Sequence, residues 1–276
     1  MFVDVLTYNM SWATQVNKVL GSEADFVEAC QSAYSSGGLQ CTENAIKNIG
    51  KLGELSLICL QEVNSDLEGR IEKVQPTLTQ HLRGTVGLSS VSTLWNPDIF
   101  GTLIHHKVIN LVDNEDRPCL FIVLKKEEEI FVVINVHMPW GDHHKTAIKN
   151  MDKYIASDSI LQDYLFDTHC KIIMMGDFND SKTTITKYKP FLLNNKTHTV
   201  RLKHNKTKKK ARKTLKSCCW HKAGHQYKNF SDTGDYVLVN KNIKQKSIKI
   251  PDIFKRRGRN NRLFSDHKPV ISRLKI

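Results

Sequence analysis

KIIMMGDFND, at residues 171–180, is the stretch of sequence that decides the fold. Four consecutive large apolar residues, at 172–175, are followed by Gly176 and Asp177. A strand that is apolar on both faces is typical of the buried centre of a sheet that is covered by helices. The stretch therefore predicts an α/β protein in which a buried strand carries the carboxylate of Asp177 to the edge of its sheet.

Comparable patterns occur along the rest of the chain. FVDVLTYN (2–9) alternates with a period of two, and LSLICLQ (55–61) is apolar on both faces. Further strands are predicted at 85–95, 99–112, 118–125, 130–137, 216–220, 234–240 and 268–275, and helices at 41–53 (with Thr42 as its N-cap), 64–74 and 144–167. Buried strands combined with antiparallel pairs favour a mixed α/β sandwich. Because no linker rich in Pro, Gly or Ser divides the chain, we expect one domain over 1–276.

The overall composition is that of a soluble globular protein. Of the 276 residues 40% are hydrophobic and 25% are charged. No apolar run approaches the roughly 20 residues that cross a bilayer, and the first residues lack a basic leader. The seven cysteines are odd in number, which favours reduced thiols. We therefore expect an intracellular protein, nuclear or cytoplasmic and not secreted, without a transmembrane segment.

Charge is distributed unevenly along the chain. Residues 1–186 hold 15 Lys and Arg against 24 Asp and Glu, whereas residues 187–276 hold 26 against 4. Such a basic third favours a polyanionic partner, although a solvated surface would also be basic. Its two clusters are a basic loop at about 196–216 and KRRGRNNR at 255–262. The first could be a nucleic-acid arm or a nuclear localisation signal, or both. The candidate nucleic-acid contacts are Lys208, Lys209, Lys210, Arg212, Lys213, Arg256, Arg257 and Arg259.

Polar residues with possible chemical roles stand at the ends of the predicted strands. They are Asn9, Gln61 with Glu62, Asn135 with His137, Asp177 with Asn179, Asp235, and Ser265, Asp266 and His267. Each alone has an ordinary structural explanation, such as a turn former or a helix cap. Because ligands of α/β sheets gather at the carboxyl ends of strands, the set as a whole predicts a site there.

Six pieces of the sequence resemble the endonuclease/exonuclease/phosphatase superfamily. They are LTYNM (6–10), ICLQEV (58–63), NVHMP (135–139), MMGDFND (174–180), GDYVLV (234–239) and SDHKPV (265–270). This superfamily of metal-dependent phosphodiesterases includes the pancreatic-type deoxyribonucleases, apurinic endonucleases, tyrosyl-DNA phosphodiesterases and sphingomyelinases. The resemblance implies a four-layer α/β sandwich of two packed mixed β-sheets flanked by helices (DNase I-like), with the site in the cleft between the sheets.

The resemblance also assigns roles to individual residues. Glu62 is the first candidate for a metal ligand, with Asn9 beside it as a neutral oxygen donor and Asp266 as a carboxylate for a second metal or for the outer shell. A sparse carboxylate set suits Mg²⁺, with Mn²⁺ as a possible substitute, better than zinc. His267, oriented by Asp235, would exchange protons or hold a phosphate oxygen. Asp177 would activate the attacking water, and Asn179 would bind a phosphate oxygen.

His137 and Arg117 complete the predicted set. The pancreatic-type deoxyribonucleases pair a His at the position of His137 with a Glu from an earlier strand, but the matching stretch here, GLSSVSTLW (87–95), contains no acid. His137 is therefore predicted to contact phosphate, in a neutral or cationic form. Arg117, which precedes a proline at the start of a strand, resembles the phosphate-binding Arg of the superfamily.

Together these features predict a Mg²⁺-dependent phosphodiesterase that hydrolyses nucleic-acid phosphodiester bonds. DNA is favoured over RNA, because the basic third would gain from neutralising many phosphates, and no obligate protein partner is inferred. Two alternatives remain open. One is a phosphatase or lipid phosphodiesterase of the same fold, and the other is a non-catalytic nucleic-acid-binding module.

Overall fold

The computed structural model describes residues 1–19, 21–64, 66–179, 217–220, 230–232, 234–251 and 265–276. Both basic clusters lie outside these ranges. So do all eight candidate nucleic-acid contacts, namely Lys208, Lys209, Lys210, Arg212, Lys213, Arg256, Arg257 and Arg259. Their roles stay predictions.

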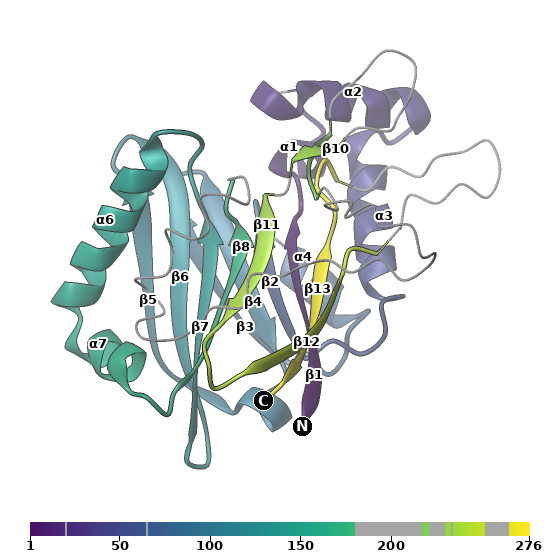
Figure 1. The fold of residues 1–276 in the computed structure, drawn as a ribbon. Coiled ribbons are helices and arrows are strands. Elements are labelled where there is room, and N and C mark those ends of the chain that lie inside the picture. The colour runs from purple at the N-terminus through teal and green to yellow at the C-terminus, as the bar shows by residue number, and fades with distance from the viewer. Residues whose placement is uncertain (20, 65, 180–216, 221–229, 233, 252–264) are drawn as a thin grey trace, which may run out of the picture.

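Helices and strands are interspersed along the first part of the chain, and beyond residue 166 the described elements are all strands (Figure 1). The strands are β1 (Phe2–Asn9), β2 (Leu57–Gln61), β3 (Gln80–Val86), β4 (Ser89–Trp95), β5 (Thr102–Val112), β6 (Glu115–Lys126), β7 (Glu129–His137), β8 (Lys171–Asp177), β9 (Cys218–Trp220), β10 (Phe230–Asp232), β11 (Asp235–Val239), β12 (Lys244–Lys249) and β13 (Val270–Lys275). The helices are α1 (Trp12–Gln15), the 3-10 helix η1 (Gly21–Glu23), α2 (Ala24–Ala33), α3 (Gly38–Ile49), α4 (Leu67–Glu72), α5 (Pro97–Phe100), α6 (His143–Ser157) and α7 (Ser159–Phe166).

Two mixed sheets form the body of the protein. One has six strands in the order β12-β13-β1-β2-β4-β3, and the other has five in the order β11-β8-β7-β6-β5. β1 and β2 are parallel in the first sheet, as are β7 and β8 in the second, while the other pairs within these two sheets are antiparallel. β9 and β10 form a short ribbon of their own.

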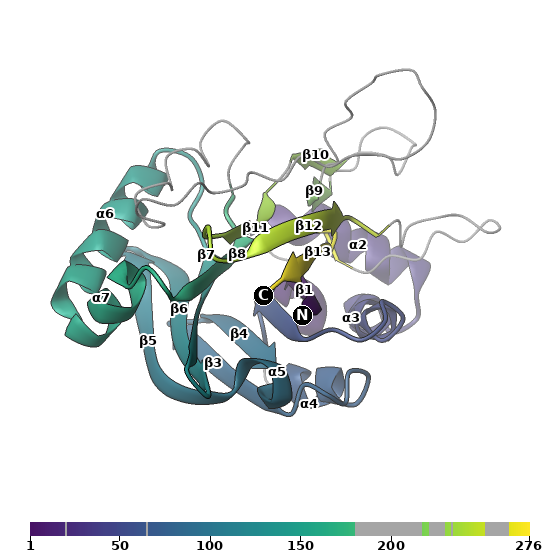
Figure 2. The ribbon, with the colours of Figure 1, turned by 60° about the horizontal axis from the view of Figure 1, so that its bottom comes forward.

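The sheets pack face to face, and helices cover their outer faces (Figures 1 and 2). Strand β8 demonstrates the layering. Ile173 and Met175 of β8 lie in the core between the sheets, whereas Ile172 and Met174 lie in the core under α6 and α7. A third core fills the space between the six-stranded sheet and α3 and α4. The result is the predicted four-layer α/β sandwich of helices, sheet, sheet and helices.

Several predicted elements differ from the observed ones in their bounds. The predicted strand at 85–95 is a hairpin of β3 and β4 that turns at Gly87, a residue with φ of +53°. The predicted helix at 144–167 is divided into α6 and α7, because the Asp158 side chain accepts a hydrogen bond from Leu161 N (3.0 Å) and so caps a new helix. Thr42 lies inside α3, so its prediction as an N-cap is wrong.

The prediction of reduced thiols is wrong for one pair of cysteines. Cys30 of α2 and Cys41 of α3 form a disulfide, with Cα atoms 6.2 Å apart. Parity of the cysteine count says nothing about which two side chains meet, and this pair meets only because α2 packs on α3. Among the described cysteines, Cys59, Cys119 and Cys170 are free and buried.

No helix in the described part of the chain is both long enough and apolar enough to cross a membrane.

Candidate active site

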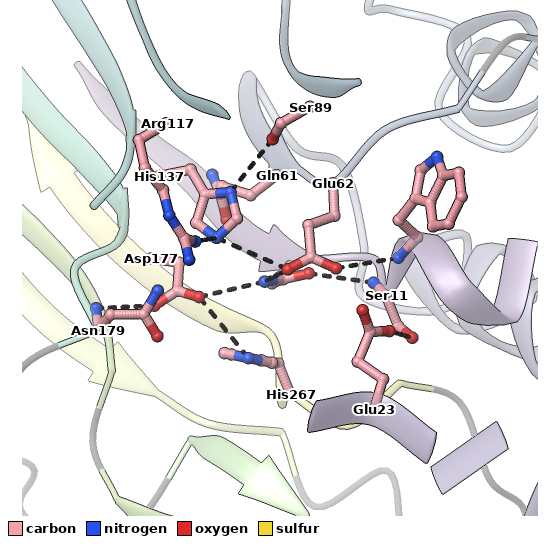
Figure 3. Close-up of polar contacts among 12 residues, drawn as sticks. Ser11, Glu23, Gln61, Glu62, Ser89, Arg117, His137, Asp177, Asn179 and His267 are labelled. Carbon is pink, nitrogen blue, oxygen red and sulfur yellow. Dashed lines mark hydrogen bonds and ion pairs between the residues drawn. The ribbon is translucent and has the colours of Figure 1, made fainter. Parts of the chain in front are cut away.

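The site residues meet because both parallel strand pairs end at the same edge of the sandwich. Asn9 at the end of β1 is level with Gln61 of β2, and His137 at the end of β7 is level with Asp177 of β8. Asn9 Nδ2 reaches Asp177 Oδ2 across the space between the two sheets, and in Figure 3 the Glu62 side chain points toward His137 and Asp177. Residues that are more than 100 positions apart in sequence thus share one cleft edge.

Two buried amides link the sheets directly beneath the site. Gln61 Nε2 donates to Asn135 Oδ1 (2.8 Å), and Asn135 Nδ2 donates to the Leu60 carbonyl (3.2 Å) and the Ser92 carbonyl (3.0 Å). Both side chains are fully buried. Because buried polar groups need their hydrogen bonds, this network fixes the distance between the strand ends. Gln61 and Asn135 therefore act as positioning residues.

Glu62 stands immediately after β2, with φ of +56°. Its Oε2 accepts a hydrogen bond from Trp12 N (3.0 Å) and its Oε1 accepts one from Asn9 Nδ2 (2.9 Å). Burial by itself raises the pKa of Glu62. The nearby His137 and these two hydrogen bonds outweigh that effect and bring the pKa below its usual value. The left-handed backbone conformation of Glu62 directs its carboxylate into the cleft. The lowered pKa favours the ionised form of that carboxylate.

Asn9 lies between two carboxylates. Its Nδ2 donates to Glu62 and also to Asp177 Oδ2 (3.1 Å), while its Oδ1 accepts from Ser11 N (3.0 Å). This assignment of the amide follows from the hydrogen-bond network, since the reverse orientation would place an oxygen against both carboxylates. Asn9 thus presents an N–H group to the site, whereas the sequence suggested an oxygen ligand.

His267 and Asp235 form a buried pair. Nδ1 of His267 lies 3.1 Å from Asp235 Oδ2 and 3.2 Å from Oδ1, and both side chains are almost inaccessible to solvent. On the other side of the ring, Nε2 lies 3.6 Å from Asp177 Oδ2. Burial lowers the pKa of His267, but Asp235, Asp177 and the neighbouring Asp266 together raise it well above the usual value. His267 is therefore an imidazolium at neutral pH.

We expect Asp235→Asn to lower the pKa of His267. The folded-state pKa of His267 exceeds its unfolded value, so its stabilisation of the fold is complete below that unfolded value, about 6.5. The stabilisation is lost as the pH rises through the raised folded-state pKa. The decrease in the pKa of His267 should be partial in Asp235→Asn, because the carboxylates of Asp177 and Asp266 remain. NMR titration of the imidazole measures it, with the exposed Asp163→Asn as control, and equal pKa values in the wild type and Asp235→Asn would refute the pairing.

Asp177 ends β8 opposite Asp235 of β11, to which it is paired in register. Its Oδ1 accepts a hydrogen bond from Asn179 N (2.9 Å), and Asn179 Nδ2 donates to the Met138 carbonyl (2.8 Å). Burial raises the pKa of Asp177, and the positive charge of His267 offsets only part of that rise. A carboxylate with a raised pKa is a stronger base than an ordinary one.

The carboxylates on the other side of Asn9 form a hard oxygen donor set. Burial raises the pKa of Asp266 to about 6, and the negative charges of Glu62 and Asp177 contribute to that rise. Burial likewise raises the pKa of Glu23, together with Glu62 and Asp266. The negative charge of Glu62 thus contributes to the raised pKa of both Glu23 and Asp266. A cation beside Glu62 would offset that repulsion, and oxygen donors suit Mg²⁺ or Mn²⁺. The residues present therefore fit a divalent cation.

A second arrangement of possible ligands overlaps the buried pair. One ligand atom from each of Asp177, Asp235 and His267 lies within 4.8 Å of the others. However, Nδ1 of His267 already hydrogen-bonds Asp235, and Nε2 lies 3.6 Å from Asp177 Oδ2. We therefore describe this group as a carboxylate–imidazole pair beside a second carboxylate.

His137 contacts Arg117 and Ser89 rather than a dedicated carboxylate partner. Arg117 Nη1 donates to His137 Nε2 (2.9 Å), and His137 Nδ1 lies 3.5 Å from Ser89 Oγ (Figure 3). Glu62 Oε1 is 3.6 Å from Nε2. Burial lowers the pKa of His137, and the Arg117 charge adds to that effect although Glu62 and Asp177 oppose it. The pKa shift and the hydrogen bond from Arg117 to Nε2 both favour the neutral form of His137, with Arg117 as the permanent cation beside it.

Sequence analysis missed three residues of this site. Glu23, which accepts a hydrogen bond from Ser11 Oγ, comes from η1, and Trp12 holds Glu62 through its backbone. Ser89 lies in the stretch 87–95, which contains no acid, and it contacts His137 Nδ1. Residues 12–33 carried no recognised motif, so no sequence signal singled out Glu23 or Trp12.

Comparison with known proteins gives a result for structure but none for sequence. No protein-family model matches the chain, and no curated protein matches it by sequence. TDP2 from C. elegans is similar in structure, with a TM-score of 0.64 at 14% identity over 100% of this chain and 76% of that one. A mannosyl-6-phosphatase from Bacteroides thetaiotaomicron gives 0.66 at 17% identity, over 99% of this chain and 100% of that one.

A third similar structure is ANGEL2, a 2′,3′-cyclic phosphatase solved with adenosine-2′,3′-vanadate. Its TM-score is 0.66 at 14% identity, over 99% of this chain and 95% of that one. Two further similar structures carry the family name endonuclease/exonuclease/phosphatase. At such low identities the likeness concerns architecture. The resemblance found in the sequence is confirmed at that level: the chain has the fold of the endonuclease/exonuclease/phosphatase superfamily.

Proposed function

We propose that this protein is a Mg²⁺-dependent phosphodiesterase that hydrolyses phosphodiester bonds of nucleic acids. The observation that carries the proposal is the convergence of Glu62, Asp177, His267 and Arg117 at one edge of the sandwich. A carboxylate cluster for a cation, a base for water and donors for phosphate oxygens are the groups that phosphoryl transfer to water requires.

The cation would be held by Glu62 and Asp266, with Glu23 beside them. When bound, Mg²⁺ neutralises charge on the phosphate and polarises its oxygens. Asn9 donates to Glu62 and Asp177, so in this proposal it orients the two carboxylates. Mn²⁺ would serve as a substitute, because it accepts the same oxygen donors.

The protein's own side chains supply proton transfer and orientation. Asp177 accepts the proton of the attacking water, and the Asn179 backbone N–H keeps its carboxylate aligned. His267, held as an imidazolium by Asp235, donates to a phosphate oxygen. One hydrogen of Asn179 Nδ2 binds the Met138 carbonyl, and the second is available for phosphate. Arg117 provides a further positive charge.

A nucleic acid is favoured as substrate by the charge distribution of the chain. Residues 187–276 carry 26 Lys and Arg against 4 Asp and Glu. A small phosphate ester would gain nothing from such an extended positive potential, whereas each phosphate of a strand that is neutralised releases counterions. DNA is favoured over RNA in this proposal.

The test is a cleavage panel with Glu62→Gln as the metal-site variant. Labelled duplex DNA, single strands, RNA, a 2′,3′-cyclic nucleotide and a sugar phosphate are incubated with Mg²⁺ or with EDTA. We expect nucleic-acid cleavage that requires the cation. In Glu62→Gln, metal affinity measured by calorimetry should fall at least about tenfold, and cleavage should fall with it. The exposed Glu128→Gln is the matched control.

Each alternative function has its own outcome in this panel. Hydrolysis of the sugar phosphate or cyclic nucleotide without nucleic-acid cleavage would identify a phosphatase. Binding of nucleic acid without hydrolysis of any substrate would identify a non-catalytic module. Cleavage that is equal in Glu62→Gln and the wild type would contradict the proposed metal site.

A further inference from the structure

A pocket of about 380 Å³ opens on one side of the site, next to Glu62 and His137. Its inner end is formed by these two largely buried side chains together with Arg117. Its outer part lies between Trp12 of α1 and the turn of the β3–β4 hairpin, where Leu88 is 82% exposed. The volume falls within the range of small-molecule sites, so one substrate group of moderate size fits beside the phosphate position.

The outer part of the pocket offers apolar contact surfaces. Leu88 is an isolated apolar side chain at the tip of a hairpin, and Trp12 is only partly buried although its neighbour Ala13 is buried. Aromatic side chains at such positions stack on the flat faces of bases, largely irrespective of sequence. A planar, uncharged group is therefore the chemical match to these walls.

The same pocket carries an excess of carboxylates. Glu23, Glu115 and Asp116 line it, in addition to Glu62. Glu115 Oε2 accepts a hydrogen bond from Arg117 Nε (3.0 Å), so the positive charge of Arg117 is already partly neutralised. Asp116 is fixed at the rim by the Leu88 backbone N–H, which donates to its Oδ2 (2.8 Å). The proposed cation would offset the charges of Glu62 and Glu23, so a second phosphate at the outer end of the pocket would face Asp116 and the Arg117-paired Glu115.

We propose that the pocket holds a nucleoside that carries no further phosphate, so that the protein cleaves the ester at the end of a strand rather than bonds inside it. Trp12 and Leu88 contact the base, and Asp116, with Glu115, rejects a continuing phosphate. The inference rests on the proposed function and adds the position of the cut. An internal bond has a phosphate on both sides, and one of them would have to enter the acidic pocket.

Three small substrates test this proposal at low ionic strength, where charge effects are least screened. They are thymidylyl-thymidine, the same compound with a 5′-phosphate and the same compound with a 3′-phosphate. In the wild type we expect one phosphorylated compound to be cleaved with at least about tenfold lower kcat/KM than thymidylyl-thymidine, since like charges repel across the pocket. The other phosphorylated compound should not show this loss, because its added phosphate lies outside the pocket.

Two variants assign the effect to named side chains. Asp116→Asn keeps an acceptor for the Leu88 N–H but removes the negative charge. The ratio of kcat/KM between thymidylyl-thymidine and the disfavoured phosphorylated compound should therefore decrease. Asp113→Asn, an exposed neighbour on the same β5–β6 hairpin, should leave the ratio as in the wild type. Trp12→Ala should raise KM for thymidylyl-thymidine, and Trp12→Phe should restore it.

The outcomes separate this inference from the proposed function. Equal cleavage of all three compounds, equal losses for both phosphorylated ones, or an unchanged ratio in Asp116→Asn would each overturn the inference while leaving a phosphodiesterase. No hydrolysis of any compound, or of nucleic acid in the cleavage panel, would instead refute the proposed function itself.

Discussion

Asp177→Asn should lower kcat by about 10²- to 10⁴-fold while leaving the protein folded, which is the range for loss of a general base. Asp177 is the buried carboxylate beside the imidazolium of His267, and its Oδ1 is aligned by Asn179. The asparagine has nearly the same shape and can still accept that hydrogen bond, but it cannot accept a proton from water. Single-turnover rates at saturating metal measure the chemical step, and circular dichroism monitors the fold.

The pH dependence provides a second readout of the same variant. Because burial raises the pKa of Asp177, the wild-type rate should increase as the pH rises through that pKa and the carboxylate ionises. This acidic limb should disappear in Asp177→Asn. Asp113→Asn, on an exposed turn, is the control for loss of one carboxylate. A kcat within tenfold of the wild type, with the limb retained, would remove Asp177 from the role of base.

Gly176→Ala should destabilise the protein by about 3 kcal/mol, because it combines backbone strain with overpacking. Gly176 is the next-to-last residue of β8, with φ of +153°, and is paired with Val136 of β7. A Cβ atom there would lie 2.0 Å from the Val136 carbonyl oxygen, which belongs to the backbone of a buried strand and cannot move aside easily. The free energy of unfolding, from urea denaturation, measures the effect.

This substitution should also reduce activity through its neighbour. Any shift of β8 away from β7 displaces Asp177, the next residue, from Asn9 and Asn179. Gly69→Ala is the matched control, because a Cβ at Gly69 meets no atom within 4 Å and alanine favours the helix α4. A Gly176→Ala protein as stable as the Gly69→Ala protein would show that the close approach of β7 and β8 is not required.

The sequence was sufficient to predict the central strands. β1 and β8 have the predicted bounds. The run KIIMMGD of β8 is apolar on both faces, and both faces are buried only where the strand lies between two cores. The polar residues that follow these strands were also predictable, because a parallel strand pair brings its carboxyl ends to one edge. Elements with weaker patterns were missed, namely η1, α1, α2, α5, β10 and β12, and most of β3 lies outside the predicted strand at 85–95.

Contacts within the site were less predictable. Asn9 was expected to offer an oxygen, yet its Oδ1 is taken by Ser11 N and its amide N–H faces the carboxylates. Whether the oxygen or the nitrogen of a side-chain amide faces the site depends on the groups around it in space. These groups cannot be identified from the sequence. Glu23 illustrates the same limit, since it approaches Glu62 only through the path of the chain between β1 and α2.

The sequence alone determined the class of fold, the strands that end in chemistry-bearing residues and the asymmetric charge of the chain, because hydrophobic periodicity and residue type are local properties. The tertiary structure alone decided that Cys30 meets Cys41, that His137 accepts a hydrogen bond from Arg117, and that an acidic pocket opens next to Glu62. Bonding partners, protonation states and cavities depend on which side chains meet across the two sheets, and those distances arise only when the layers pack.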